Sequence, residues 1–389
     1  MKKTTSLLLA ISLLAAQDSV TTIRILQRDV VRLCAFQGRG HASSGAKRAI
    51  RYIRRRFQSM GFEVRVDTFP LSVYRLWRAR LWVSQDGRTW HALRLGKDFI
   101  PFGGSPSTEG TWEIDTLPQQ GKGWLSDKAF STAYAEAVRV KVACLVMRSK
   151  KLAATVSTRP ERLPVIYVID TLPPFRYIRL ILQGKVHQTV GWNVSARLRG
   201  RSSDSAWVVG AHYDHLGRVE GMTFWGANDN ASGVAILFSL AGRLRASQQP
   251  PYDIWFVAFG AEELGLIGSQ YWVNHPPYPL ERLKGMLNFD LMGFGEDGVG
   301  VVGAVDQLTF WERIDTVRRA LGWETSLLLR PIAPNSDHYP FYEKGVPALF
   351  FYLLGGPGFY HDMYDRPETL SWKAAYPFLR WIEGILRYV

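Results

Sequence analysis

Imidazole and carboxylate side chains recur in five short segments of the C-terminal half of this 389-residue chain. The segments hold His212, Asp214 and His215; Asp229; Glu262 and Glu263; Asp290; and His361. Histidine and carboxylate ligands without cysteine favour zinc or a similar divalent cation, with oxygen-rich coordination and an open position for catalysis. The residue types therefore predict a catalytic metal centre.

These polar segments follow stretches that are typical of buried strands. Trp207–Gly210 and Ile254–Phe259 are continuous apolar runs, as expected for strands covered on both faces, and a helix is predicted between them from Ala231 to Leu244. Alternating strands and helices predict an α/β fold, with three αβα layers around a largely parallel central mixed sheet. Ligands gather beyond the carboxyl ends of strands in such folds, where the polar residues lie.

Further elements follow along the core. We expect one helix to begin near Glu263, a second to span Leu308–Leu321 and a third to run from Ala375 to Val389. A further strand is expected over Pro347–Leu353. The region from residue 189 onward therefore predicts one α/β unit.

The region before it divides into two parts. Residues 17–64 predict two amphipathic helices, the second rich in arginine and ended by Gly61. Residues 65–188 contain short aromatic and β-branched runs, such as Val140–Met147 and Val165–Ile169, broken by glycine and proline. We expect them to form a mostly β insertion.

Residues 1–16 have the order of an export signal. Lys2 and Lys3 precede an apolar stretch from Ser6 to Ala16 that is too short to span a bilayer, and small residues suggest cleavage before Gln17. The alternative is a buried N-terminal helix. We expect a periplasmic or secreted protein without an integral membrane segment after processing.

The charge and cysteine content of the chain limit which binding partners and cross-links we expect. The chain has 48 Lys and Arg against 34 Asp and Glu, a formal charge of +14, but its arginine cluster lies on the solvated face of a predicted helix without a nucleic-acid-binding signature. We therefore expect no nucleic-acid partner. Its two cysteines, Cys34 and Cys144, are too few for a disulfide scaffold, and whether they pair stays open, as does the oligomeric state.

Taken together, the motifs resemble one family, the co-catalytic di-zinc exopeptidases, which include bacterial leucyl aminopeptidases, aminopeptidase Y and glutamate carboxypeptidase II. The motifs are His-Tyr-Asp-His (212–215), Gly-Ala-Asn-Asp-Asn-Ala-Ser-Gly (226–233), Glu-Glu-Leu-Gly-Leu-Ile-Gly-Ser (262–269), Asn-Phe-Asp (288–290) and Tyr-His (360–361). The resemblance implies a di-zinc peptidase core over residues 189–389, and places the insertion where relatives carry a protease-associated domain.

The resemblance also implies the ligands of two Zn²⁺ ions. It assigns His212, Asp229 and Asp290 to one zinc and Asp229, Glu263 and His361 to the other, so that Asp229 bridges them. The family's last motif usually reads His-Thr-Pro-Asp-Asp, whereas this chain has His-Asp-Met-Tyr-Asp at 361–365.

Other residues receive supporting roles. Glu262 is the expected general base, and Asp214 is expected to orient the imidazole of His212. Asp337 and His338 either contact substrate or tie down a loop. The remaining histidines are read as surface or structural residues; they are His41, His91, His187 and His275.

The expected function is removal of N-terminal residues from peptides by an exported zinc aminopeptidase. Three alternatives stay open. They are a carboxypeptidase of the same family, a glutaminyl cyclase-like enzyme with one zinc, and a catalytically silent binding protein on the same scaffold.

Overall fold

A three-layer core with a mixed sheet at its centre underlies the fold. The computed structural model describes residues 2–389, with side chains from Gln17 onward. The core strands lie in the order β15-β14-β16-β13-β9-β12-β8. Their bounds are β8 (Tyr177–Leu198), β9 (Ser202–His212), β12 (Tyr252–Phe259), β13 (Leu283–Phe289), β14 (Gly298–Val302), β15 (Leu327–Arg330) and β16 (Ala348–Leu354). This architecture confirms the predicted α/β fold.

The four central strands are parallel. β16 pairs with β13, β13 with β9 and β9 with β12 in parallel, whereas β14 joins β16 and β8 joins β12 in antiparallel fashion. Because the central strands are buried on both faces, their residues alternate between two cores: Trp207 and Val209 face one, and Ala206 and Val208 the other.

Helices cover both faces of the sheet. The first core contains residues of α1 (Lys2–Cys34), α2 (Ser44–Ser59), α4 (Gly233–Ala246), α6 (Leu308–Ala320) and α8 (Ala375–Tyr388). The second contains residues of α5 (Ile267–Asn274) and α7 (Tyr339–Glu343). The hydroxyl of Ser43 caps α2 by accepting hydrogen bonds from the amides of Gly45 and Ala46, which contributes about 1 kcal/mol.

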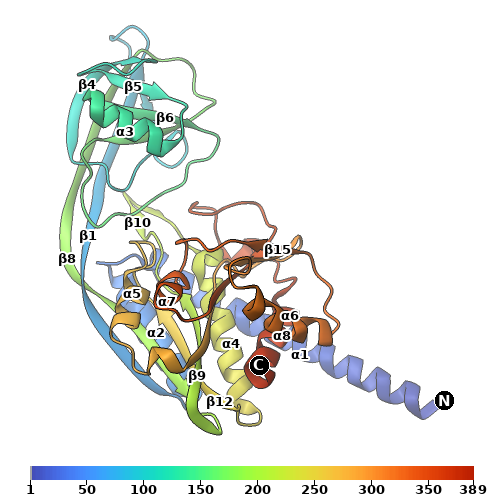
Figure 1. Cartoon of the computed structure of the whole chain (residues 1–389). Coiled ribbons are helices and arrows are strands. Elements are labelled where there is room, and N and C mark those ends of the chain that lie inside the picture. Colours follow the sequence, from blue (N-terminus) through green and yellow to red (C-terminus); the bar gives the residue numbers. More distant parts are fainter. Residues whose placement is uncertain (1) are drawn as a thin grey trace.

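A long two-stranded ribbon joins this core to the insertion. β1 (Glu63–Ser84) pairs with β8 along its whole length, from Glu63 opposite Arg197 to Ser84 opposite Tyr177. Figure 1 shows both strands running from the core into the upper lobe. The insertion was expected to begin at residue 65 and end at residue 188, and both positions lie within strands of this ribbon. The insertion and the core therefore share one sheet.

The upper lobe contains short strands and one helix. Its elements are β2 (His91–Leu93), β3 (Phe99–Pro101), β4 (Thr108–Asp115), β5 (Gly123–Ser126), α3 (Phe130–Val140), β6 (Cys144–Ser149) and β7 (Val165–Ile169). The strand expected over Val140–Met147 is wrong in its first half, because Val140 ends α3 and Lys141 adopts a left-handed conformation with φ of 64°.

The helix expected near Glu263 is also misplaced, because α5 begins at Ile267. Ala261, Gly265 and Leu266 have positive φ values, which interrupt a right-handed helix. Both glutamates therefore lie in a turn.

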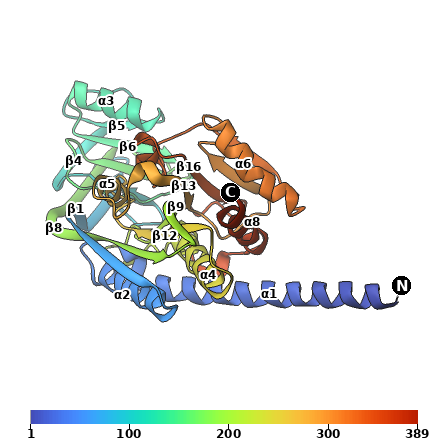
Figure 2. The same cartoon turned by 60° about the horizontal axis from the view of Figure 1, so that its bottom comes forward.

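The first helix extends well beyond the core at its N-terminal end (Figure 2). The export signal expected at residues 1–16 lies outside the described side chains, and only its backbone, from Lys2, belongs to α1. Among the described helices, none is both long and apolar enough to cross a membrane.

Both cysteines are free and buried, Cys34 in the first core and Cys144 in the insertion. Burial raises the pKa of each thiol to about 12. Because the two cysteines lie in different buried clusters, they form no disulfide bond with each other in this fold.

Candidate metal centre and active site

The carboxyl ends of the central strands bring the predicted ligands together. His212 is the last residue of β9, Glu262 and Glu263 follow β12, Asp290 follows β13, and His361 lies in the loop after β16. Because these four strands are parallel neighbours, their carboxyl ends meet at one edge of the sheet.

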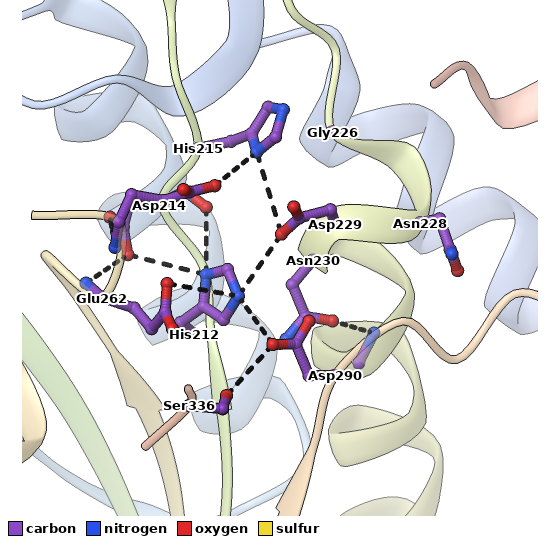
Figure 3. A network of polar contacts seen from close by, with 12 residues as sticks. His212, Asp214, His215, Gly226, Asn228, Asp229, Asn230, Glu262, Asp290 and Ser336 are labelled. Carbon is purple, nitrogen blue, oxygen red and sulfur yellow. Dashed lines mark hydrogen bonds and ion pairs between the residues drawn. The ribbon is translucent and has the colours of Figure 1, made fainter. Parts of the chain in front are cut away.

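The first set of ligand atoms surrounds Nε2 of His212. This nitrogen lies 3.4 Å from Oδ1 of Asp229 and 3.3 Å from Oδ2 of Asp290 (Figure 3). Ligands bound tetrahedrally to zinc at about 2.0–2.1 Å are roughly 3.3 Å apart. The spacing therefore suits three ligands of one cation.

A second set has the same spacing. Nε2 of His361 lies 3.3 Å from Oδ2 of Asp229 and 3.1 Å from Oε2 of Glu263. Each oxygen of Asp229 thus faces a different imidazole, as expected of a carboxylate shared by two cations.

The chemistry of the site fits positively charged ions. Oδ2 of Asp229, Oδ1 of Asp290 and Nε2 of His361 are buried without a hydrogen-bond partner, which is costly for polar atoms. Among the described side chains, the ion-pair partners of Asp229, Glu262, Glu263 and Asp290 are histidines. The carboxylates thus lack lysine or arginine partners, and divalent cations would supply the missing charge.

The negative charge of the site acts strongly on His361. Burial alone lowers its pKa, but the neighbouring carboxylates of Glu263 and Asp229 outweigh burial and raise that pKa to about 11. The site therefore attracts a cation, which is a proton when metal is absent.

Glu262 lies close enough to His212 and Asp290 to share an ion with them, although its contact with His212 is longer than those of the predicted ligands. Its Oε2 is 3.9 Å from Nε2 of His212. Burial raises the pKa of Glu262 well above its ordinary value, and the nearby carboxylate of Glu263 adds to the rise. A raised pKa is what a carboxylate needs to exchange protons near neutral pH.

Asp214 holds the turn that carries both glutamates. Its Oδ1 and Oδ2 accept hydrogen bonds from the amides of Glu262 and Glu263, at 3.2 and 3.4 Å. Nδ1 of His212 lies 3.3 Å from the backbone carbonyl oxygen of Asp214 and 3.8 Å from its Oδ1. The closer contact of that imidazole is thus with the backbone of Asp214.

Asp229 is held through its backbone. The carboxylate of Asp365 accepts hydrogen bonds from the amides of Asn228 and Asp229, at 2.8 and 3.0 Å. Gly226 begins the same turn with φ of 59°, and a Cβ there would lie 2.2 Å from the carbonyl oxygen of Asp229. This position therefore requires glycine.

A fully buried arginine links the loops that carry His212 and Asp229. The guanidinium of Arg39 donates hydrogen bonds to the carbonyl oxygens of Tyr213, Trp225 and Gly226, at 2.6, 2.8 and 2.7 Å. Its planar fork can reach several acceptors at once. The loop after α1 thus positions ligands far along the chain.

His215, to which no role was assigned from the sequence, lies beside Glu263 in the structure. Its Nδ1 is 2.7 Å from Oε1 of Glu263 and 3.8 Å from Oδ1 of Asp229. A separation of 2.7 Å is a hydrogen-bond distance, shorter than the roughly 3.3 Å between two ligands of one zinc. We therefore read His215 as a donor to Glu263, although its ring lies close enough to that cluster to ligate.

His41 was expected outside the site but packs against it. Its Nε2 accepts a 2.7 Å hydrogen bond from the amide of Ala261 and lies 3.4 Å from Oδ2 of Asp214. His41 and His215 line a cavity of about 60 Å³ behind Glu263, and each has a buried ring nitrogen without a protein partner. The cavity is large enough for water.

Asp337 and His338 lie beneath the site, and both are fully buried. Burial raises the pKa of Asp337 to about 7 and lowers that of His338 to about 3. The neighbouring Ser336 donates a 3.0 Å hydrogen bond to Oδ2 of Asp290 (Figure 3). Nδ1 of His338 lies 3.1 Å from the carbonyl oxygen of Ser336, whereas both carboxylate oxygens of Asp337 are buried without a hydrogen-bond partner, so the two roles expected for these residues both stay predictions.

Tyr360 is a further aromatic group of the site. Its ring stacks on that of His361, with centroids 3.9 Å apart, and about half of its side chain is exposed. Its phenol is protonated at neutral pH and lies beside the carboxylates of Asp229 and Glu263, where it is a hydrogen-bond donor.

Comparisons with known proteins match the part of the chain that holds this site. Residues 193–384, just under half of the chain, match the model of peptidase family M28. The matched region contains all five predicted ligands and the expected general base, Glu262.

Two curated relatives share this region. Aminopeptidase YwaD of Bacillus subtilis is 33% identical over 174 residues, covering 42% of this chain and 36% of the relative. Leupeptin-inactivating enzyme 1 of Streptomyces exfoliatus is 35% identical over 160 residues, covering 41% of this chain and 35% of the relative. The matches thus span about a third of each relative's length.

A solved structure extends the likeness to nearly the whole fold. The zinc aminopeptidase BSAP from Bacillus subtilis has a TM-score of 0.74 at 22% identity, covering 93% of both chains. At this identity the comparison concerns the fold, including the insertion.

Proposed function

We propose that this chain is an exported zinc-dependent aminopeptidase that hydrolyses N-terminal residues from peptides. The observation that carries the proposal is the pair of three-ligand sets that share Asp229, with Glu262 beside them. The match to the M28 family model and the names of the aminopeptidase relatives support the reaction class.

Two zinc ions would be held by His212, Asp290, Glu263 and His361, with Asp229 between them. They would polarise the scissile carbonyl and lower the pKa of a bound water. Glu262 accepts a proton from the attacking water and returns it to the leaving amine. The hydroxyl of Tyr360 can donate a hydrogen bond to the carbonyl oxygen as negative charge develops there.

The charge of the site favours an amino over a carboxyl terminus. The described ion pairs around the centre consist of carboxylates and imidazoles. A carboxypeptidase needs a lysine or arginine close to the centre to bind the terminal carboxylate, and neither residue type takes part in these described ion pairs.

Substrate panels test the proposal. We expect aminoacyl amides and peptides with free amino termini to be cleaved, and N-acetylated versions of the same peptides to resist. Equal hydrolysis of free and acetylated peptides would favour carboxypeptidase or endopeptidase action. Release of pyroglutamate by protein that holds one zinc would favour the glutaminyl cyclase alternative.

Metal removal provides a second test. We expect a chelator to abolish turnover and added zinc or cobalt to restore it. Full activity of protein shown by elemental analysis to be metal-free would exclude the mechanism. Protein that holds two zinc ions yet cleaves nothing in the panel would favour the silent binding protein.

Export rests on the N-terminal pattern of Lys2, Lys3 and the apolar stretch to Ala16. Cleavage before Gln17 would retain Asp18, whose carboxylate pairs with Arg243 at 3.1 Å and accepts a hydrogen bond from Tyr376. N-terminal sequencing of the mature protein should begin at or near Gln17. An intact Met1 on exported or cell-associated protein would contradict this cleavage.

A further inference from the structure

The insertion contacts the loop that carries His361. Nζ of Lys151, just beyond β6, donates hydrogen bonds to the carbonyl oxygens of Gly358 and Tyr360, at 2.5 and 2.6 Å. Three residues later, the amide of Ala154 donates a 3.0 Å hydrogen bond to the carbonyl oxygen of His361 itself. Three carbonyl groups of one short loop are thus held by residues of the insertion.

The segment that makes these contacts is itself fixed. The hydroxyl of Ser149 bonds the backbone of Lys151, and that of Thr155 accepts a 2.8 Å hydrogen bond from the amide of Gly103. The carbonyl oxygen of Ser157 accepts a 2.8 Å hydrogen bond from the amide of Tyr74, in β1. The contacts to the His361 loop therefore start from a segment anchored at several points.

Apolar packing reinforces the same junction. Ala154 belongs to a buried cluster with Leu216 and Phe224, against which Met363 packs. Leu216 follows the His212 strand, Phe224 precedes the Asp229 turn, and Met363 follows His361. The insertion thus meets three ligand-bearing loops.

The His361 loop needs outside support. His361 has φ of 57°, a left-handed conformation that is strained for a residue with a side chain. The neighbouring residues Gly355–Gly358 and Tyr360 are exposed, so few contacts hold the loop from the solvent side. Such a conformation persists where surrounding contacts determine it.

We propose that Lys151 is a positioning residue of the metal centre, which fixes the His361 loop so that Nε2 of His361 faces Asp229 and Glu263. The insertion is then a structural part of the second metal site. This inference rests on the proposed function, because it takes His361 as a zinc ligand.

The matched pair Lys150 and Lys151 gives the test. Lys151→Met removes the donor and keeps much of the side chain's volume, whereas Lys150→Met changes an exposed neighbour. We expect Lys151→Met to weaken binding of the second zinc by about 10–100-fold, the range for groups that orient metal ligands. Lys150→Met should match wild type, and Lys151→Arg should restore much of the affinity.

Zinc per chain and competition with a chelator measure this affinity. With excess zinc, the second site refills, so we expect kcat of Lys151→Met to recover with KM near wild type. A general loss of fold would not be reversed by zinc. In metal-free protein, chymotrypsin should cut near Phe359 and Tyr360 faster in Lys151→Met than in Lys150→Met.

Hydrogen exchange of the wild-type protein supplies a test that does not depend on a variant. Coupling between two sites is reciprocal, so zinc binding should slow exchange of the Ala154 amide. Unchanged exchange at Ala154, or equal zinc affinity of the two methionine variants, would overturn the inference. Failure of wild type to bind a second zinc would instead contradict the proposed function.

Discussion

The imidazole of His215 lies 2.7 Å from Oε1 of Glu263, while Oε2 of the same carboxylate lies 3.1 Å from Nε2 of His361. The two oxygens of Glu263 therefore have different neighbours, one a hydrogen-bond donor and the other a predicted co-ligand. A donor on one oxygen fixes the direction in which the other presents its lone pairs.

Replacing His215 should loosen this arrangement. His215→Leu leaves Oε1 of Glu263 without its donor, and we expect the affinity of the second zinc to fall about 10–100-fold. Competition with a chelator measures the change, and His275→Leu, at an exposed histidine, is the control. An affinity equal to that of the control would refute this role.

Substitution of the adjacent residues Glu262 and Glu263 should have different effects, one on turnover and the other on metal binding. Glu262→Gln keeps the shape of the side chain but cannot accept a proton, so we expect turnover to fall on the order of 10²–10⁴-fold with metal retained. Glu263→Gln removes an anionic ligand and should weaken the site shared with His361.

Elemental analysis beside the turnover rate distinguishes these two roles. Loss of zinc from Glu262→Gln with both ions retained in Glu263→Gln would show that the roles are reversed. Full activity of Glu262→Gln would show that another group is the base.

Arg39 should matter for stability more than any exposed arginine of α2. Arg39→Lys cannot reach all three carbonyl oxygens, and each buried acceptor left unpaired costs about 1–3 kcal/mol. We expect the free energy of unfolding to fall by roughly 2–4 kcal/mol, measured by denaturant titration of metal-free protein. Arg51→Lys, on the exposed face of α2, should change it by less than about 0.5 kcal/mol.

The two thiols should be inert in the folded protein. Both are buried with pKa raised to about 12, and the thiolate is the reactive form. We expect a thiol reagent to label neither Cys34 nor Cys144 in native protein and both in denaturant. Fewer than two reactive thiols in denatured, unreduced protein would reveal a disulfide that this fold does not contain.

Local patterns predicted the core elements well. The helix expected over Leu308–Leu321 spans Leu308–Ala320, and the strand expected over Pro347–Leu353 spans Ala348–Leu354. Each has a clear apolar pattern whose period matches its structure. The turn at Glu262 and Glu263 escaped prediction because left-handed residues such as Leu266 delay the helix.

Site residues could be predicted from the sequence where they belong to a short motif. His212 and Asp290 stand in recognisable motifs at strand ends and Asp229 in one before α4, and the structure brings the three together. His41, Arg39 and Lys151 act through contacts with backbone atoms far along the chain, and no spacing in the sequence encodes such partners. His215 was visible in its motif, but its donor role depends on a carboxylate that only the fold brings near.

The β1–β8 ribbon has a consequence for the order in which the chain can fold. Ser84 and Tyr177 close the shortest loop between the two strands, whereas Glu63 and Arg197 close the longest. Because the strands of the upper lobe lie between Ser84 and Tyr177 and shorten this loop once they pair, ladder formation that starts at the insertion end meets the smaller entropic barrier. We therefore expect the upper lobe to nucleate the ladder, and the register to propagate downward until β8 presents its edge to β12. A nascent chain would then gain its core only after the lobe is ordered.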